Sequence, residues 1–155
     1  MATFHTTRAA IEGFVSQKTL ALVGASRSGK GFGHALLKEL VKKGAKVFPV
    51  HPEATEIAGL KCYRTLAEVP EGVGGVVVVV PPEEAVGVVR DAIAARIPRV
   101  WLQQGAESPE AVSLAEQAGV QVVAGRCLLM FAEPVQGWAH RFHRWLLKVT
   151  KRLPA

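Results

Sequence analysis

Residues 75–80, GVVVVV, constrain the fold more than any other part of this chain of 155 residues. The run is rich in β-branched side chains and has no polar alternation, which indicates a strand buried on both faces. Such strands belong to parallel sheets that helices cover above and below. Strand-like apolar runs alternate with helix-like segments along the rest of the chain, and this pattern predicts the same architecture. We therefore predict an α/β fold: a Rossmann-like, doubly wound parallel sheet in three αβα layers.

The same patterns predict where the elements lie in a single domain that spans residues 1–155. The first strand is followed by a Gly/Ser-rich turn, and the helix after it ends in two lysines and a glycine. We expect the short strand LKCY beyond the second strand, and GVVVVV beside the first. The expected strands are 19–24, 45–50, 60–63, 75–80, 99–104 and 120–125, and the expected helices are 6–17, 33–44, 66–69, 82–96, 108–119 and 138–152.

The net charge of +6 is concentrated in the last predicted helix. Residues 138–155 hold five basic residues and no acid, so the remaining 14 basic and 13 acidic residues sum to only +1. Apolar side chains form one stripe of this helix, including Trp138, Phe142 and Trp145. Tryptophans at helical spacing are usually buried, so we expect this stripe to pack on the sheet, on a second copy in a homodimer or on a partner protein. We expect it to bind neither nucleic acid nor a membrane.

Several other features of the sequence limit which class of protein this can be. No apolar run approaches the roughly 20 residues that span a bilayer, and the first ten residues lack an export signal, so we expect a cytoplasmic protein. Cys62 and Cys127 lie far apart and outside any CxxC spacing, which indicates neither a metal site nor a disulfide. The chain has no Asn and a single Asp, a composition that predicts a thermostable protein.

The segment GASRSGKGFG, residues 24–33, lies between the first strand and the first helix of the sheet. Two hydroxyls and two cations fall within five residues, at Ser26, Arg27, Ser28 and Lys30. Because the free N–H groups at a helix start attract anions, this segment predicts a phosphate-binding loop. A simple Gly-rich turn that only connects strand and helix is the alternative interpretation.

Three known loop classes match this segment incompletely. A Walker A loop requires Ser or Thr at position 31 to hold magnesium, and the chain has Gly31. A nucleophile elbow requires glycine at Ser28 and a triad that the sequence does not show. A dinucleotide fingerprint requires glycine at Ser26 and an acid after the second strand, where His51 and Pro52 stand. An NAD(P)-binding oxidoreductase remains an alternative that lacks both of these markers.

Read together, six segments give a more specific signal than any one loop: GASRSGKGFG, VFPVHP, LKCY with TLAEVP, VVVVVPP, WLQQGAES and GRC. In order and spacing they resemble the CoA-binding domain family over about residues 8–132. These are small stand-alone proteins similar to the nucleotide-binding domain of the succinyl-CoA synthetase alpha subunit. The resemblance implies that the ligand lies across the C-terminal ends of the strands.

Carried over by position, the resemblance implies a set of CoA contacts along this chain. The loop after the first strand meets the pyrophosphate and the 3′-phosphate, and the residues after the second strand flank the adenosine. An apolar wall follows the fourth strand, and the loop after the next strand meets the pantetheine arm. The implied contacts are Gly24, Ala25, Ser26, Arg27, Ser28, Lys30, Gly33, His51, Pro52, Val80, Pro81, Pro82, Gln104 and Gly105. The prolines and His51 can also serve only to end strands and begin helices.

We expect binding of coenzyme A or an acyl-CoA without catalysis. The synthetases carry a phosphorylated histidine in a second domain, and we expect no such domain in this chain. None of its histidines has a visible catalytic partner in the sequence; they are His5, His34, His51, His140 and His143. We expect no catalytic residue and no metal site. The rival hypotheses are the NAD(P)-binding domain and an interaction protein that works through the basic helix.

Overall fold

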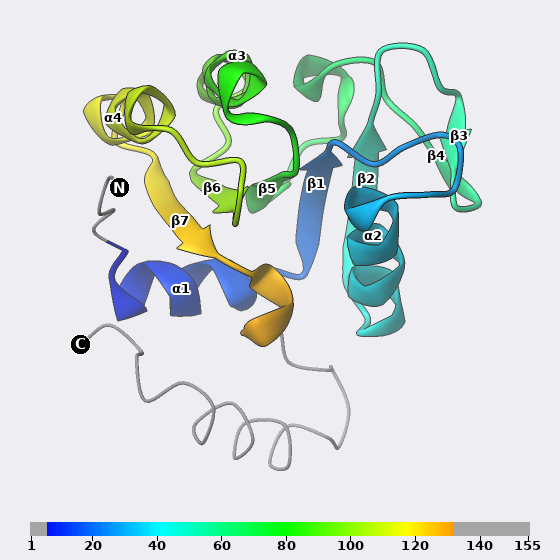
Figure 1. Ribbon diagram of the computed structural model, residues 1–155, viewed down its shortest axis with the longest axis horizontal. Helices are drawn as coiled ribbons and strands as arrows, with labels where there is room; N and C mark the ends of the chain where they lie inside the picture. Colours follow the sequence, from blue (N-terminus) through cyan, green and yellow to red (C-terminus); the bar gives the residue numbers. More distant parts are fainter. Residues whose placement is uncertain (1–5, 132–155) are drawn as a thin grey trace.

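The computed structural model describes residues 6–131, and the parallel sheet predicted from the sequence is present (Figure 1). Its five strands run in the order β2-β1-β5-β6-β7. They are β1 (Thr19–Val23), β2 (Lys46–Val50), β5 (Gly75–Val78), β6 (Arg99–Gln103) and β7 (Gln121–Arg126). The predicted α/β class with a doubly wound order is confirmed.

Helices cover both faces of the sheet, as the apolar strands require. On one face lie α1 (Arg8–Val15) and α2 (Phe32–Lys42), and on the other lie α3 (Pro82–Ala94) and α4 (Pro109–Gln117). Two single-turn 3₁₀ helices complete the described chain, η1 (Leu66–Glu68) and η2 (Leu128–Met130). The predicted C-terminal helix, 138–152, lies outside the described residues, and its role in a homodimer or with a partner stays a prediction.

Strand β5 is the central strand that its sequence predicted. It pairs with β1 on one side and β6 on the other, both in parallel. Val76 and Val78 pack under α3 and α4, whereas Val77 points to the opposite core, with Trp101 and the residues of α1. All three valines are fully buried. Burying a valine side chain contributes about 1.5–3 kcal/mol, so this strand is a main source of the fold's stability.

The segment LKCY lies beyond β2 as predicted, but it is not a strand of the main sheet. β4 (Leu60–Lys61) pairs antiparallel with β3 (Glu56–Ile57), and Tyr63 alone forms a parallel bridge to Val50. The two residues between β3 and β4 both have positive φ, 53° at Ala58 and 77° at Gly59. Two such residues make a tight hairpin turn, which favours local pairing over extension of the sheet.

The strand order reverses between β1 and β5, since β1 continues through α2 to β2 and the chain then returns to the other side. At this point Gly24 has φ of 120°, and a Cβ there would lie 2.0 Å from the carbonyl oxygen of Val79. A Cβ at Gly33 would lie 2.5 Å from the carbonyl oxygen of Gly24. Only glycine allows these approaches, so both residues are required by packing.

Replacing Gly24 by alanine tests this requirement. We expect Gly24→Ala to lower the free energy of unfolding by about 3 kcal/mol, because it combines a backbone clash with an unfavourable φ. Urea unfolding followed by circular dichroism measures the change.

Gly87→Ala is the matched control, because this helical glycine of α3 has no atom within 4 Å of the added Cβ and no positive φ. It should raise stability by about 0.5–1 kcal/mol. Equal effects of the two changes would contradict the packing argument.

Candidate functional site

The carboxyl ends of the parallel strands meet at one edge of the sheet, and the predicted contacts follow four of these strands. The loop after β1 leads into α2, and residues 51–55 follow β2. The chain after β5 leads directly into α3, and residues 104–108 join β6 to α4. In folds of this type ligands bind along this edge, at the point where the strand order reverses. The site is therefore built on four loops that are distant in sequence and adjacent in the sheet.

The loop after β1 leaves the start of α2 open. Gly31 is the N-cap with φ of 91°, and no side chain caps the helix. The Oγ of Ser26 accepts a hydrogen bond from the backbone N–H of Ser28 at 3.0 Å, and the two hydroxyls are hydrogen-bonded to each other. These bonds shape the turn, and the first backbone amides of α2 have no acceptor within the helix.

The remaining predicted residues of this loop differ in exposure. The side chain of Ala25 packs in the core, so only its backbone can reach a ligand. Lys30 is exposed, and so is Arg27, whose Nη2 lies 3.4 Å from Oε2 of Glu53. Both side chains of this ion pair are about two-thirds exposed, at 62% and 66%. The pair joins the loop after β1 to the loop after β2 and leaves both charges accessible.

His51 shapes the loop that follows β2. Its Nδ1 accepts hydrogen bonds from the backbone N–H groups of Glu53 and Ala54, each at 3.0 Å. A ring nitrogen that accepts must be unprotonated, so the ring carries its proton on Nε2. Pro52 is exposed at the tip of this turn. His51 therefore has a structural role in ending the strand, and only its Nε2–H remains free for a ligand.

The predicted residues after β5 and β6 also lie at this edge. Val80 is half-buried, Pro81 is the N-cap of α3 and Pro82 is its first residue. Gln104 is exposed, and Gly105 has φ of 97° and donates its N–H to the Glu107 carboxylate at 2.7 Å. These residues form the other end of the same edge.

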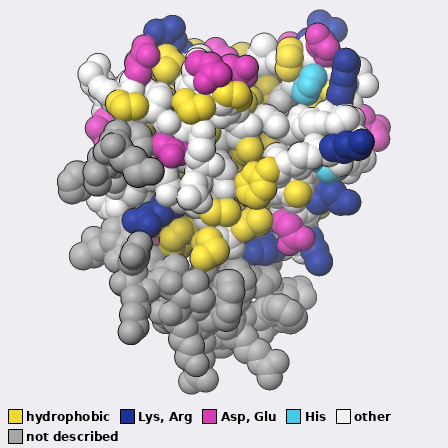
Figure 2. Space-filling view, in the orientation of Figure 1, with side chains coloured by type: hydrophobic (Ala, Val, Ile, Leu, Met, Phe, Trp, Pro, Cys, Tyr) yellow, Lys and Arg dark blue, Asp and Glu magenta, His cyan; other side chains and the backbone are white. Residues whose placement is uncertain are grey.

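Charge is distributed unequally around the edge. Arg27 and Lys30 lie just before α2 at this edge, whereas the first turns of α3 and α4, which begin at the same edge, carry only acids: Glu83, Glu84 and Glu110. Figure 2 shows the acids gathered over α3 and α4, and most Lys and Arg side chains along the side of α2 and the β3–β4 hairpin. An anionic ligand is therefore favoured on the β1–β2 side of the site.

The sequence did not identify three residues that the structure brings to this edge. Gln103 is only 2% exposed, and its Oε1 accepts the backbone N–H of Leu128, which ties the end of β6 to the segment after β7. Phe32 begins α2 with half of its surface exposed, at 51%. Arg64 follows the bridge at Tyr63. A polar residue ending an apolar strand was the only sequence signal for Gln103.

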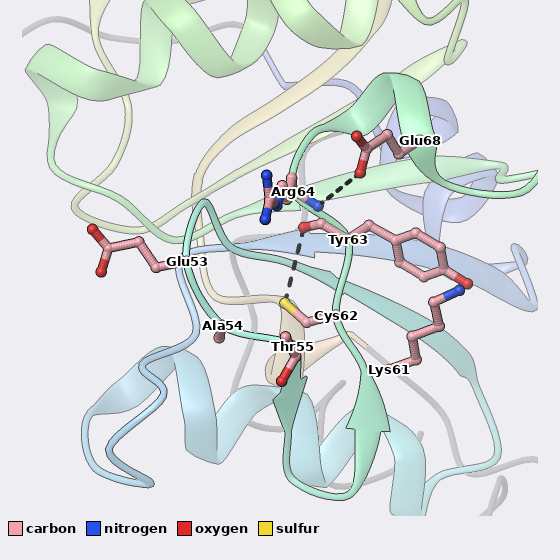
Figure 3. A pocket seen from close by; sticks show the side chains of 8 residues that line it. All are labelled: Glu53, Ala54, Thr55, Lys61, Cys62, Tyr63, Arg64 and Glu68. Carbon is pink, nitrogen blue, oxygen red and sulfur yellow. Dashed lines mark hydrogen bonds between the residues drawn. The ribbon is translucent and has the colours of Figure 1, made fainter.

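Beside the end of β2 is a pocket of about 460 Å³, which contains none of the predicted site residues (Figure 3). The loop after β2 forms one wall, and the chain from β4 to η1 forms the other. Its charged residues are two bases and two acids. The lining residues are Glu53, Ala54, Thr55, Lys61, Cys62, Tyr63, Arg64 and Glu68.

Neither the cysteines nor the carboxylates form a metal centre in the described part of the chain. Among residues 6–131, no three His, Cys, Asp or Glu side chains lie close enough together to hold a metal ion. Cys62 is buried and Cys127 half-buried, and both are free thiols. None of the helices within this range is long and apolar enough to cross a membrane.

Residues 18–133 match the CoA binding domain family. The match covers most of the chain, and the doubly wound parallel sheet is the α/β fold of this family. The chain belongs to the CoA-binding domain family. The resemblance stated from its sequence motifs is thereby confirmed.

Solved structures and curated relatives agree with this assignment. A hypothetical protein from Pyrococcus horikoshii is 30% identical with a TM-score of 0.76, over 95% of this chain and 99% of that one. A conserved hypothetical protein from Pyrococcus furiosus is 44% identical with a TM-score of 0.69, over 72% and 97%. The ADP-forming acetate–CoA ligase I of Archaeoglobus fulgidus is 28% identical over 123 residues, 73% of this chain. That match covers 18% of the ligase, so the chain spans less than a fifth of this relative's length.

The environment of Cys62 generates a prediction about its reactivity. Burial raises the pKa of the Cys62 thiol, and hydrogen bonding with the backbone of Tyr63 and His51 offsets part of the rise. Since the thiolate is the reactive form, iodoacetamide should label Cys62 at pH 7 at least about tenfold more slowly in the folded than in the unfolded protein. Peptide mass spectrometry measures both rates, and equal rates would show that the thiol is neither buried nor shifted.

Proposed function

We propose that this protein binds coenzyme A or an acyl-CoA through the loop after β1 and catalyses no reaction itself. The observation that carries the proposal is the start of α2: an open helix N-terminus flanked by the exposed cations Arg27 and Lys30. It lies where the strand order reverses, in a chain of the CoA-binding domain family. A pyrophosphate at this point gains both amide hydrogen bonds and the attraction of the helix dipole.

The position of the loop suggests how the rest of the ligand lies. With the pyrophosphate at residues 24–33, the adenosine extends toward the end of β2, where His51 offers its Nε2–H and Pro52 its ring. The pantetheine arm extends in the other direction, along Val80 and the prolines to Gln104. This direction agrees with the charge distribution, because the ligand's phosphates then lie on the basic side of the edge.

Two contacts favour CoA over a nicotinamide dinucleotide. The second strand ends in His51, whose ring nitrogen accepts from the backbone, and not in an acid that binds a ribose diol. The nearby acid, Glu53, forms an ion pair with Arg27. Glu53 would have to leave this ion pair before it could bind the ribose diol of a dinucleotide. CoA instead brings phosphates that Arg27 can bind directly.

The described histidines support a binding role without chemistry. The Nδ1 of His34 lies 3.3 Å from the backbone oxygen of Ser26, and the Nδ1 of His51 accepts two backbone amides. Both rings thus hold the loops that would contact the ligand. Ser26, the serine nearest to a nucleophile position, is hydrogen-bonded within its own turn.

Ligand-dependent thermal stability tests the class of ligand. CoA at about 100 times its dissociation constant should stabilise the fold by about 2.7 kcal/mol and raise the melting temperature by roughly 5–10 °C. NAD and ATP with magnesium at the same concentration should give smaller shifts. Differential scanning fluorimetry measures all three, and a shift with NAD that equals or exceeds that with CoA would favour the oxidoreductase hypothesis.

Charge removal in the loop tests the site. Arg27→Ala and Lys30→Ala should each weaken CoA binding by about 1–3 kcal/mol, measured by isothermal titration calorimetry. Arg27→Ala should have the larger effect, because it also leaves the Glu53 carboxylate unpaired beside the phosphates. Added salt should weaken binding less in both variants than in the unmodified protein.

Lys38→Ala is the control, since it removes an exposed charge from α2 away from the loop. Normal CoA binding by both loop variants would mean that the assignment of the loop is wrong.

A further inference from the structure

The bridge between Tyr63 and Val50 brings a cation, Arg64, to the end of β2. This residue was not predicted from the sequence. The N–H of His51 donates to the carbonyl of Tyr63 at 2.8 Å, and the N–H of Tyr63 donates to the carbonyl of Pro49 at 2.9 Å. The two segments run parallel. Arg64 therefore leaves the sheet at the same edge as His51, one residue after the bridge.

Arg64 is held at its backbone and free at its side chain. Its N–H donates to Oε2 of Glu68 at 3.2 Å, which fixes the chain as η1 begins. Within residues 6–131, no carboxylate lies within ion-pair distance of its guanidinium. Figure 3 shows the side chain directed from its strand segment toward the loop that carries Glu53, at the pocket described above.

The other charges of the pocket are already engaged in contacts. Lys61 places its Nζ 5.2 Å from the centre of the Tyr63 ring, a cation–π contact. Glu53 is paired with Arg27, and Glu68 accepts the Arg64 amide. Arg64 is thus the charged side chain of this pocket that has no partner among the described residues, and it presents a planar fork of donors.

We propose that Arg64 binds the 3′-phosphate of coenzyme A in the pocket beside β2. In doubly wound folds the ribose of an adenine nucleotide lies at the end of the second strand. A guanidinium there suits a phosphate on that ribose, because it can donate two parallel hydrogen bonds to phosphate oxygens. This inference rests on the proposed function and adds a residue that selects CoA over nucleotides with an unmodified ribose.

The proposal departs from the position that the family resemblance implied for the 3′-phosphate, at the loop after β1, and divides the cations of the site between two groups of the ligand. Arg27 and Lys30 flank the open start of α2 and serve the pyrophosphate, whereas Arg64 lies across the Glu53 loop and serves the 3′-phosphate. Lys61 and Arg64 balance Glu53 and Glu68 in this pocket, so its lining residues have no net charge. Removing Arg64 leaves two acids against one lysine and should repel the phosphate.

The experiment compares CoA with dephospho-CoA, which lacks the 3′-phosphate. Calorimetry on the full chain should show Arg64→Ala weakening CoA binding by about tenfold and dephospho-CoA binding by less than about twofold. Arg64→Lys should give an intermediate loss for CoA, because the charge remains and the bidentate fork does not. Adenosine 3′,5′-bisphosphate should lose affinity to the same extent as CoA.

Arg96→Ala is the control, because Arg96 is exposed just after α3 at the opposite edge of the sheet. It should change neither affinity. Equal losses of the two ligands in Arg64→Ala, or no loss of either, would overturn the assignment of Arg64 and leave CoA binding itself intact. If the unmodified protein bound neither ligand, the proposed function would fail together with this inference. Unchanged unfolding midpoints would show that all variants are folded.

Discussion

The contact between the backbone of Gly24 and the carbonyl of Val79 is the constraint on which the rest of the site depends. It joins the ends of β1 and β5 at the point where the chain reverses its order in the sheet. Gly33 then packs against Gly24, which sets where α2 begins. Because the start of α2 and the ends of β1 and β5 are in direct contact, both ends of the loop between β1 and α2 are held in a fixed position. A phosphate-binding turn needs its two ends fixed in this way, because its donors are backbone amides that cannot adjust their positions as side chains do.

Elements whose sequences carry a local or periodic signal were predicted well. The valines of β5 predicted a central buried strand, and the alternation of strands and helices predicted the parallel sheet. The β3–β4 hairpin was not predicted, because its turn depends on positive φ at Ala58, a residue that rarely adopts it. The pairing of residues 60–61 was therefore assigned to the wrong sheet, although their place beyond β2 was right.

The residues predicted for ligand contact follow the order of strands, so the structure brings them to one edge, and their role in binding stays a prediction. The glycine-rich turn and the residues after β2, β5 and β6 all lie at the predicted edge. Arg64 and Gln103 became visible only through a bridge and a side-chain hydrogen bond that join distant segments. His51 shows a related limit, since its sequence position suggested ligand contact and the structure adds a hydrogen-bonding role in the turn. Single residues can serve both purposes, and sequence alone does not separate them.

The glycines of the loop fall into two groups that evolution should treat differently. Gly24 and Gly33 are confined by neighbouring backbone, whereas a Cβ at Gly29 or Gly31 would meet no atom within 4 Å. The first pair is required by the packing of this chain, whether or not it binds a ligand. The second pair only gives the loop its shape, through φ of 78° and 91°. A descendant that lost its ligand would keep Gly24 and Gly33 while Gly29, Lys30 and Gly31 drifted, so these three positions report retained binding among relatives better than the glycine pattern as a whole.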